Sequence, residues 1–165
     1  MSWSRRGVLT GLAAALALVP ACGFTPVYAP GGGGAALDGA VQVRQFDSDD
    51  GFVLARALRN RLGPPQTARY TLSYSVGITS EQVAITTDQI TQRFNLIGRA
   101  PYQLTDAATG AVVVQGTAEA FSSYSALGTS VAVEAAERDG RERLMRLLAD
   151  RIMTDLIAGV TVAAP

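Results

Sequence analysis

The stretch YTLSYSVGIT at residues 70–79 alternates without interruption between apolar and small side chains. Apolar residues occupy the even positions from Tyr70 to Ile78, and threonine, serine or glycine occupies the odd positions. Because successive side chains of a strand point to opposite faces of a sheet, this period of two predicts a strand with one buried and one solvent-facing side. The segments around this strand must therefore supply the cover for its apolar face.

Two more strands are predicted after it. The run 90–105 also separates its side chains by face. Its apolar face consists of Ile90, Phe94, Leu96, Tyr102 and Leu104, and its polar face of Thr91, Arg93, Asn95, Arg99, Gln103 and Thr105. Pro101 has no backbone donor, which predicts an edge or a bulge at this point. The segment 106–110 has the composition of a turn and leads into a strand at 112–124.

Two segments have helical periodicity. After a short predicted strand at 40–46, three acids precede three leucines at i+4 spacing, arginines occupy the later turns, and Gly63-Pro64-Pro65 stops the pattern, which predicts one short amphipathic helix. The acids are Asp47, Asp49 and Asp50, the leucines Leu54, Leu58 and Leu62, and the arginines Arg56, Arg59 and Arg61. A longer helix is predicted from about Ser130 to Leu156, with Gly159 as its cap. Its apolar stripe is Val133, Ala136, Gly140, Leu144, Leu147, Leu148, Ile152 and Leu156, and its i,i+4 ion pairs are Glu137/Arg141, Asp139/Arg143 and Glu142/Arg146.

The order of elements is β-α-β-β-β-α. It predicts an α+β fold, a mostly antiparallel four-stranded sheet with two helices packed on one face. The opposite face of the sheet is polar and stays open, either to meet a partner or simply to meet water.

The first 22 residues have the pattern of an export signal. Arg5 and Arg6 precede an apolar run from Val8 to Val19, and the only cysteine of the chain, Cys22, follows. This pattern predicts cleavage before Cys22 and acylation of its thiol. The run is short for a transmembrane helix, which needs about 20 apolar residues, and its context argues against a buried thiol. The paired arginines also fit a twin-arginine signal, so the export route stays open.

The chain is accordingly divided into three parts. Residues 1–21 are the predicted signal peptide. Residues 22–39 are the predicted lipidated N-terminus and a flexible, glycine- and alanine-rich tether. Residues 40–165 form the predicted single periplasmic α+β domain, which is long enough to bury one core.

The composition excludes most catalytic chemistry. The chain has no histidine and no lysine, and its one cysteine is assigned to the lipid. Triads that need histidine, Schiff bases and imidazole metal sites are therefore excluded, and no pair of carboxylates stands in an apolar setting that would separate two pKa values. Without Arg5 and Arg6, the remaining 12 of the 14 arginines face 14 carboxylates, a formal charge of −2 that does not attract nucleic acid. We expect a binding or structural protein, not an enzyme, with no cofactor and no metal.

The segment CGFTPVY at residues 22–28 resembles the mature start of the LptE family of lipopolysaccharide-assembly lipoproteins. The order of elements is also similar: an arginine-rich first helix at 56–62, a Tyr-Thr-Leu strand at 70–72, Ser-Ser-Tyr at 122–124 and a long Arg/Leu helix. The resemblance implies a lipoprotein of the cell outer membrane, lipid-anchored on its periplasmic side. Such a protein is the plug and assembly partner of the LptD barrel in lipopolysaccharide transport to the cell surface. Gly23 also resembles outer-membrane sorting, whereas the lack of lysine departs from the family.

Arg93 and Arg99 are the candidate contacts with lipopolysaccharide or with the partner. Both lie on the polar face of the 90–105 run, and a guanidinium group binds phosphate bidentately. The alternatives are that they pair with Glu119 across the sheet or hold the barrel. A different class of function, a lipid-anchored accessory subunit of an envelope ABC-type transporter, also fits a small α/β lipoprotein. A lipoprotein hydrolase would need a pair of carboxylates in a cleft, which nothing in the sequence selects.

Overall fold

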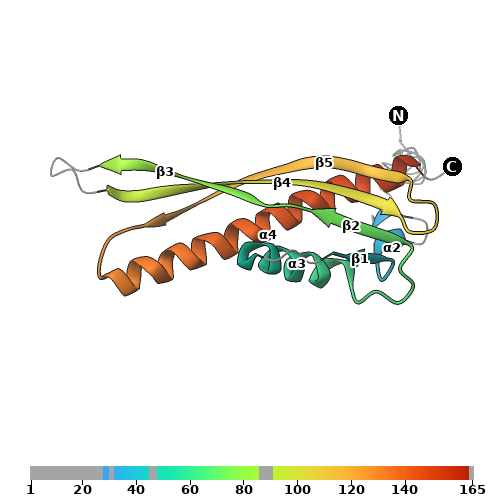
Figure 1. Ribbon diagram of the computed structural model, residues 1–165, viewed down its shortest axis with the longest axis horizontal. Coiled ribbons are helices and arrows are strands. Elements are labelled where there is room, and N and C mark those ends of the chain that lie inside the picture. Colours follow the sequence, from blue (N-terminus) through green and yellow to red (C-terminus); the bar gives the residue numbers. More distant parts are fainter. Residues whose placement is uncertain (1–27, 30–31, 45–47, 86–90, 164–165) are drawn as a thin grey trace, which may run out of the picture.

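In the computed structural model of the chain, the described residues are 28–29, 32–44, 48–85 and 91–163, without the side chains of 84–85, 91–92 and 162–163. The predicted signal peptide, Cys22 and Ile90 lie outside them. The elements are α2 (Gly33–Leu37), β1 (Val41–Val43), α3 (Asp49–Leu62), β2 (Tyr70–Tyr74), β3 (Gly77–Ile85), β4 (Thr91–Asp106), β5 (Val112–Ser125) and α4 (Ser130–Ala163). They form an elongated molecule of two layers, with the sheet on one side and α3 and α4 on the other (Figure 1).

The sheet is organised around β4. Strand β5 pairs antiparallel with one side of β4, and β2 and β3 pair antiparallel, one after the other, with its other side. Strand β1 pairs parallel with β2 through Val41–Val43. The predicted α+β class is confirmed, but the sheet has five strands instead of four and is mixed. Two differences explain this: β1 runs parallel to its neighbour, and the predicted strand 70–79 is divided in two and extends to Ile85.

The division between β2 and β3 lies opposite Pro101. The register to β4 continues unchanged across it, from Tyr74↔Tyr102 to Gly77↔Arg99. The Ser75 amide still donates to the Pro101 carbonyl at 3.1 Å, but proline has no N–H to return the bond. The prediction of an edge or a bulge at Pro101 is therefore wrong: the residue lies in the middle of the sheet with an unchanged register, and its missing N–H leaves a gap in the ladder instead.

The core lies between the sheet and the two helices. The inward face of β4, with Leu96, Tyr102 and Leu104, is buried as the alternation predicts. Helix α3 begins at Ser48, whose hydroxyl accepts a hydrogen bond from the Gly51 amide at 3.0 Å, and ends at Gly63 with φ of 70°. The predicted acids in the first turn, arginines in the last turn and stop at Gly63 are thus confirmed, whereas the cap at Ser48 is not predicted from the sequence.

Helix α4 runs along the whole length of the sheet and is longer than predicted (Figure 1). Gly159 does not cap it but lies inside it, where a Cβ would come within 2.5 Å of a Val114 methyl group. Glycine therefore serves close packing of α4 on β5 here, and the helix continues to Ala163. In the described ranges no helix combines the length and the apolar character needed to cross a membrane.

The polar side of α4 largely follows the prediction. The pairs Glu137/Arg141 and Asp139/Arg143 form, at 3.0 and 2.6 Å. The third predicted pair, Glu142/Arg146, is not among the ion pairs of the described residues. In the apolar stripe, Leu144 and Leu148 are fully buried, whereas Leu147 is 41% exposed.

Part of the expected tether is folded. Residues 33–37 form α2, which packs against the C-terminal end of α4 and buries Leu37 completely. Gly33 allows this close approach, because a Cβ there would come within 2.6 Å of the Ile157 carbonyl oxygen. The division of the chain into signal peptide, tether and domain otherwise stays a prediction.

Candidate functional site

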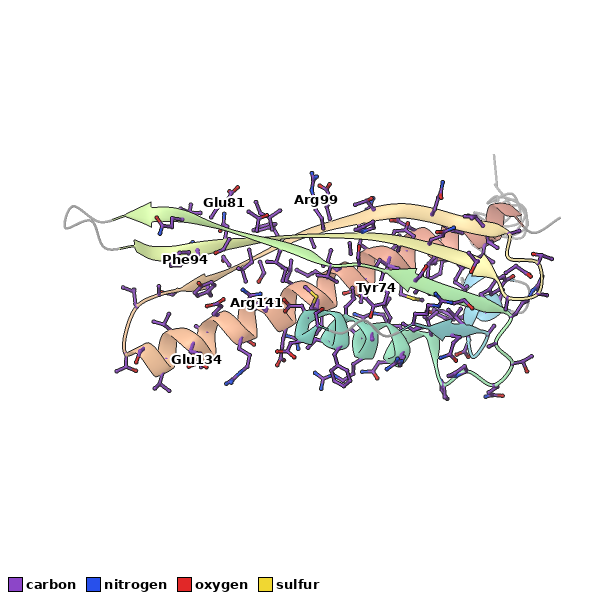
Figure 2. All side chains as sticks on the ribbon, in the orientation of Figure 1. Tyr74, Glu81, Phe94, Arg99, Glu134 and Arg141 are labelled. Carbon is purple, nitrogen blue, oxygen red and sulfur yellow. The ribbon has the colours of Figure 1, made fainter. Side chains whose placement is uncertain are left out.

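The polar outer face of the sheet carries the two predicted contact residues. Arg93 and Arg99 both lie on β4 with exposed side chains. Figure 2 shows Arg99 on the side of the sheet turned away from α3 and α4, whereas Tyr74 points toward α3. The alternation of β4 thus places the arginines on the open face as expected.

Arg99 has an ion partner on the neighbouring strand. It stands directly opposite Glu119 of β5, and its Nη2 lies 2.9 Å from a carboxylate oxygen of that residue. Both side chains are more than half exposed, at 68% and 56%, so the pair adds little to stability. One of the alternatives named above, pairing across the sheet, is therefore realised for Arg99.

Arg93 differs from Arg99 in this respect. It stands opposite Ser125 and, within the part of the chain that the structure describes, makes no ion pair. Six residues along a strand separate the two arginines, a distance of roughly 20 Å. The structure therefore does not bring them to one anion site, and each would bind a separate group.

Between β2, β4 and β5 the sheet has a shallow depression of about 580 Å³ around Pro101. Its lining is uncharged and includes the hydroxyls of Ser73, Ser75 and Thr117 and the amides of Gln103 and Gln115. Such a surface offers hydrogen bonds to an uncharged polar group but no general acid or base. Within the described ranges no cluster of histidine, cysteine or carboxylate side chains could hold a metal ion.

Two tyrosines with raised pKa values connect the sheet to the helices. The Tyr102 hydroxyl donates to Asp155 of α4 at 3.1 Å. Burial, and then the negative charge of Asp155, raises the pKa of Tyr102 to about 12. The Tyr74 hydroxyl donates to the Gly51 carbonyl of α3 at 2.8 Å, and burial raises its pKa as well. Both tyrosines also line the depression around Pro101, but each hydroxyl donates to a helix on the other side of the sheet and so positions that helix.

Arg141 joins the two helices. Its guanidinium group lies 3.1 Å from Asp50 at the start of α3 and 3.0 Å from Glu137 of α4. These carboxylates raise the pKa of Arg141 against the opposing effect of its burial. The sequence predicts only the pair within α4, because the Asp50 contact joins residues 91 positions apart.

Two exposed apolar side chains were not singled out from the sequence as surface residues. Phe121 of β5 is 67% exposed and Leu147 of α4 is 41% exposed. Both line a shallow groove of about 430 Å³ between β5 and α4. The parity of β5 would have identified Phe121, because it shares the outward face with Glu119. Nothing in the sequence indicates that Leu147 is exposed, because its spacing fits the apolar stripe of α4 that is predicted to be buried.

Comparisons with known proteins place this fold among lipoproteins. The family model LptE, lipopolysaccharide-assembly, matches residues 39–156. No curated protein sequence matches the chain. A candidate lipoprotein of known structure from Caulobacter crescentus CB15 is 26% identical, with a TM-score of 0.67 over 81% of this chain and 98% of that chain.

Two more solved structures share the fold at lower identity. Rare lipoprotein B from Shewanella oneidensis is 13% identical, with a TM-score of 0.56 over 75% of this chain and 96% of that chain. A minor lipoprotein from Acinetobacter baumannii is 18% identical, with a TM-score of 0.53 over 72% of this chain and 88% of that chain. Because the family model spans most of the chain and nearly all of the folded layers, the chain belongs to the LptE family of lipopolysaccharide-assembly proteins.

Proposed function

We propose that this protein is an outer-membrane lipoprotein that acts as plug and assembly partner of the LptD barrel in lipopolysaccharide transport. The observation that carries the proposal is the match of the LptE family model over residues 39–156. The geometry supports it: α3 and α4 cover one face of the sheet (Figure 1), and the other face carries exposed polar side chains such as Arg93, Arg99 and Glu119 and is open to a partner. An internal plug would supply contacts around which the wall of the barrel closes.

In this proposal Cys22 carries the lipid anchor on the periplasmic side of the outer membrane. Acyl chains contribute about 0.8 kcal/mol per buried CH₂ to membrane binding. Because a single acyl chain binds a membrane only reversibly, stable anchoring needs more than one chain. Arg93 is the better placed of the two candidate contacts, because its guanidinium group has no ion pair with the described residues. Arg99 must exchange Glu119 for a lipid phosphate or a group of the barrel.

The role needs no catalytic step. The chain has no histidine or lysine, and Tyr74 and Tyr102, whose pKa values are raised, are buried with their hydroxyls bonded to the helices. Binding, and support of a partner's fold, are the functions that the remaining side chains can perform.

The test is purification of the tagged full-length protein from membranes, followed by identification of the proteins that co-purify. We expect an LptD-like barrel in the outer-membrane fraction and, on depletion of the protein, less assembled barrel and less surface lipopolysaccharide. Other outer-membrane barrels should be less affected and serve as the control. Recovery of inner-membrane transporter subunits instead, with unchanged barrel assembly, would favour the accessory-subunit alternative and reject the proposal.

The anchor is tested separately with Cys22→Ala and Cys22→Ser. Both variants should leave the membrane fraction when the barrel is absent, because the acylated thiol is lost. A mature N-terminus that is unacylated, or that begins elsewhere than at Cys22, would contradict the lipoprotein part of the proposal.

A further inference from the structure

The sheet has three open edges, and only one of them is long and regular. Strand β1 has three residues. Strand β3 carries Glu81 and has register shifts between Gln82, Ala84 and Ile85. Strand β5 pairs with β4 in one unbroken register from Ser125 to Val114. Short strands, charges and bulges protect sheet edges against added strands, and in the regular part of β5 the one such feature is the charge of Glu119, which is paired with Arg99.

The register shows which backbone groups of β5 point outward. Pro101 of β4 directs its carbonyl to Ser75 on the β2 side, so its opposite residue Thr117 forms a pair without mutual hydrogen bonds. The N–H and C=O of Thr117 therefore point away from β4. The same holds at every second position, which includes Gln115, Glu119 and Phe121.

Most of these outward groups have no hydrogen-bond partner among the described residues. At one end of the edge, Arg143 of α4 donates to the Ser123 carbonyl at 2.9 Å. From Gln115 to Phe121, no hydrogen bond with another described residue occupies the outward N–H and C=O groups. A segment of about 20 Å thus displays one donor and one acceptor at every second residue.

Helix α4 lies beside this edge and contributes an apolar surface. The groove between them contains Phe121 from the strand and Leu147 from the helix. Leu147 belongs to the apolar stripe of α4 but is exposed, because the sheet ends at β5 and no further strand lies above it. One more strand beside β5 would cover Leu147 and complete the burial of that stripe.

The charged side chains of the groove are all paired within the protein. Glu119 pairs with Arg99, Asp150 with Arg61, and Arg151 with Asp155. The groove therefore has no unpaired charge to attract a polyanionic lipid headgroup. It fits an extended protein segment with uncharged side chains toward α4.

We propose that the edge of β5 from Gln115 to Phe121 is a docking site for an extended segment of the protein partner, which joins the sheet as an additional strand over Leu147. The inference rests on the proposed function, because the partner is the barrel proposed above. It names the surface and the mode of contact: main-chain hydrogen bonds give the affinity, and the apolar groove selects the inward side chains.

The decisive variant is Thr117→Pro, with Thr117→Ala as its matched control. Proline removes the outward N–H and adds a ring at the edge, but it breaks no bond to β4, and such positions tolerate proline. The alanine variant loses the side chain and keeps the N–H. With full-length protein and the purified barrel, Thr117→Pro should bind about tenfold more weakly, and Thr117→Ala within about twofold of wild type.

A second measurement does not depend on a variant. Hydrogen exchange of the wild-type peptide that covers residues 115–121 should slow at least about tenfold in the complex with the barrel, and the peptide over β3 should change less. Equal binding of Thr117→Pro and wild type, or unchanged exchange at 115–121 in a complex that does form, would overturn the inference alone. If the wild-type protein does not bind the barrel at all, the proposed function fails instead.

Discussion

The contact between Tyr102 and Asp155 gives a prediction about alkaline stability. The Tyr102 side chain is 6% exposed, and its hydroxyl donates to the Asp155 carboxylate at 3.1 Å. Replacement by phenylalanine keeps the ring and removes the hydroxyl. Hydrogen bonds to charged groups contribute about 1.5–3 kcal/mol. Asp155 is 28% exposed, and water can replace part of the lost bond. We therefore expect Tyr102→Phe to cost about 1.5 kcal/mol at pH 8.

This cost should disappear at high pH. The pKa of Tyr102 rises from the ordinary 10.0 to about 12 in the folded protein, first through burial and then through Asp155. The folded state thus holds the proton more tightly than the unfolded state. The stability that the protonated hydroxyl contributes is complete below pH 10 and is lost as the pH rises through 12. At about 1.4 kcal/mol per pKa unit, the wild type should lose about 2 kcal/mol by pH 11.5 that the variant cannot lose.

The composition makes the measurement clean. The chain has no lysine and no histidine, so apart from the thiol of Cys22 the tyrosines are the side chains whose ordinary pKa lies near the range from pH 9 to 11.5, and both proteins contain Cys22. Tyr74 and Tyr124 also have raised pKa values, but both proteins contain them, and their effect cancels in the difference. Urea unfolding followed by far-ultraviolet circular dichroism at pH 8, 10 and 11.5 gives the two free energies. A difference between wild type and Tyr102→Phe that stays constant over this range would refute the reasoning.

Three further predictions use other parts of the structure. Leu148→Ala should lower the free energy of unfolding by about 2–5 kcal/mol, because Leu148 is fully buried, whereas Leu147→Ala at the preceding position should lower it by less than about 1 kcal/mol. Denaturant unfolding compares the two variants, and equal losses would contradict the assigned faces of α4. Gly33→Ala should detach α2, because its Cβ would come within 2.6 Å of a carbonyl oxygen of α4. We expect faster proteolysis between residues 33 and 40, and a cleavage rate equal to that of wild type would contradict the prediction. Arg93→Ala combined with Arg99→Ala should change stability by less than about 1 kcal/mol but weaken binding of lipopolysaccharide in a salt-dependent way; binding equal to wild type across a salt series would leave both arginines without a lipid role.

Local patterns in the sequence predict the elements well. The alternation in 70–79 and 90–105 assigns the side chains of β2, and the described side chains of β4 that it names, to the correct face, and α3 ends at Gly63 as predicted. The turn at 106–110 is also confirmed: the Asp106 carboxylate accepts bonds from the amides of Ala108 and Thr109, which lower its pKa, and Gly110 has a positive φ. Each of these features depends on residues within a few positions of one another.

The features that the sequence does not predict depend on distant contacts. The ladder is broken at Ser75 because Pro101 lies opposite, and this pairing joins two different strands. Helix α2 has little intrinsic helix propensity, and its packing against α4 holds it in place. Leu147 is exposed because the sheet ends at β5. That β5 is an edge strand can likewise be recognised only from the strand order, because the sequence of a strand does not show how many strands pair with it.

The packing of α2 on the last turns of α4 also affects how the domain is made. Gly33 and Ile157, which are in contact, lie near opposite ends of the described chain. A chain delivered from its N-terminus can form α3 and the strands early, but α2 has no surface to pack on until the final turns of α4 arrive. Contacts between such distant positions slow folding. A chain that crosses a membrane unfolded would therefore leave its N-terminal segment unfolded until translocation is nearly complete. During that interval the unpacked residues of α2 would be accessible to chaperones and proteases.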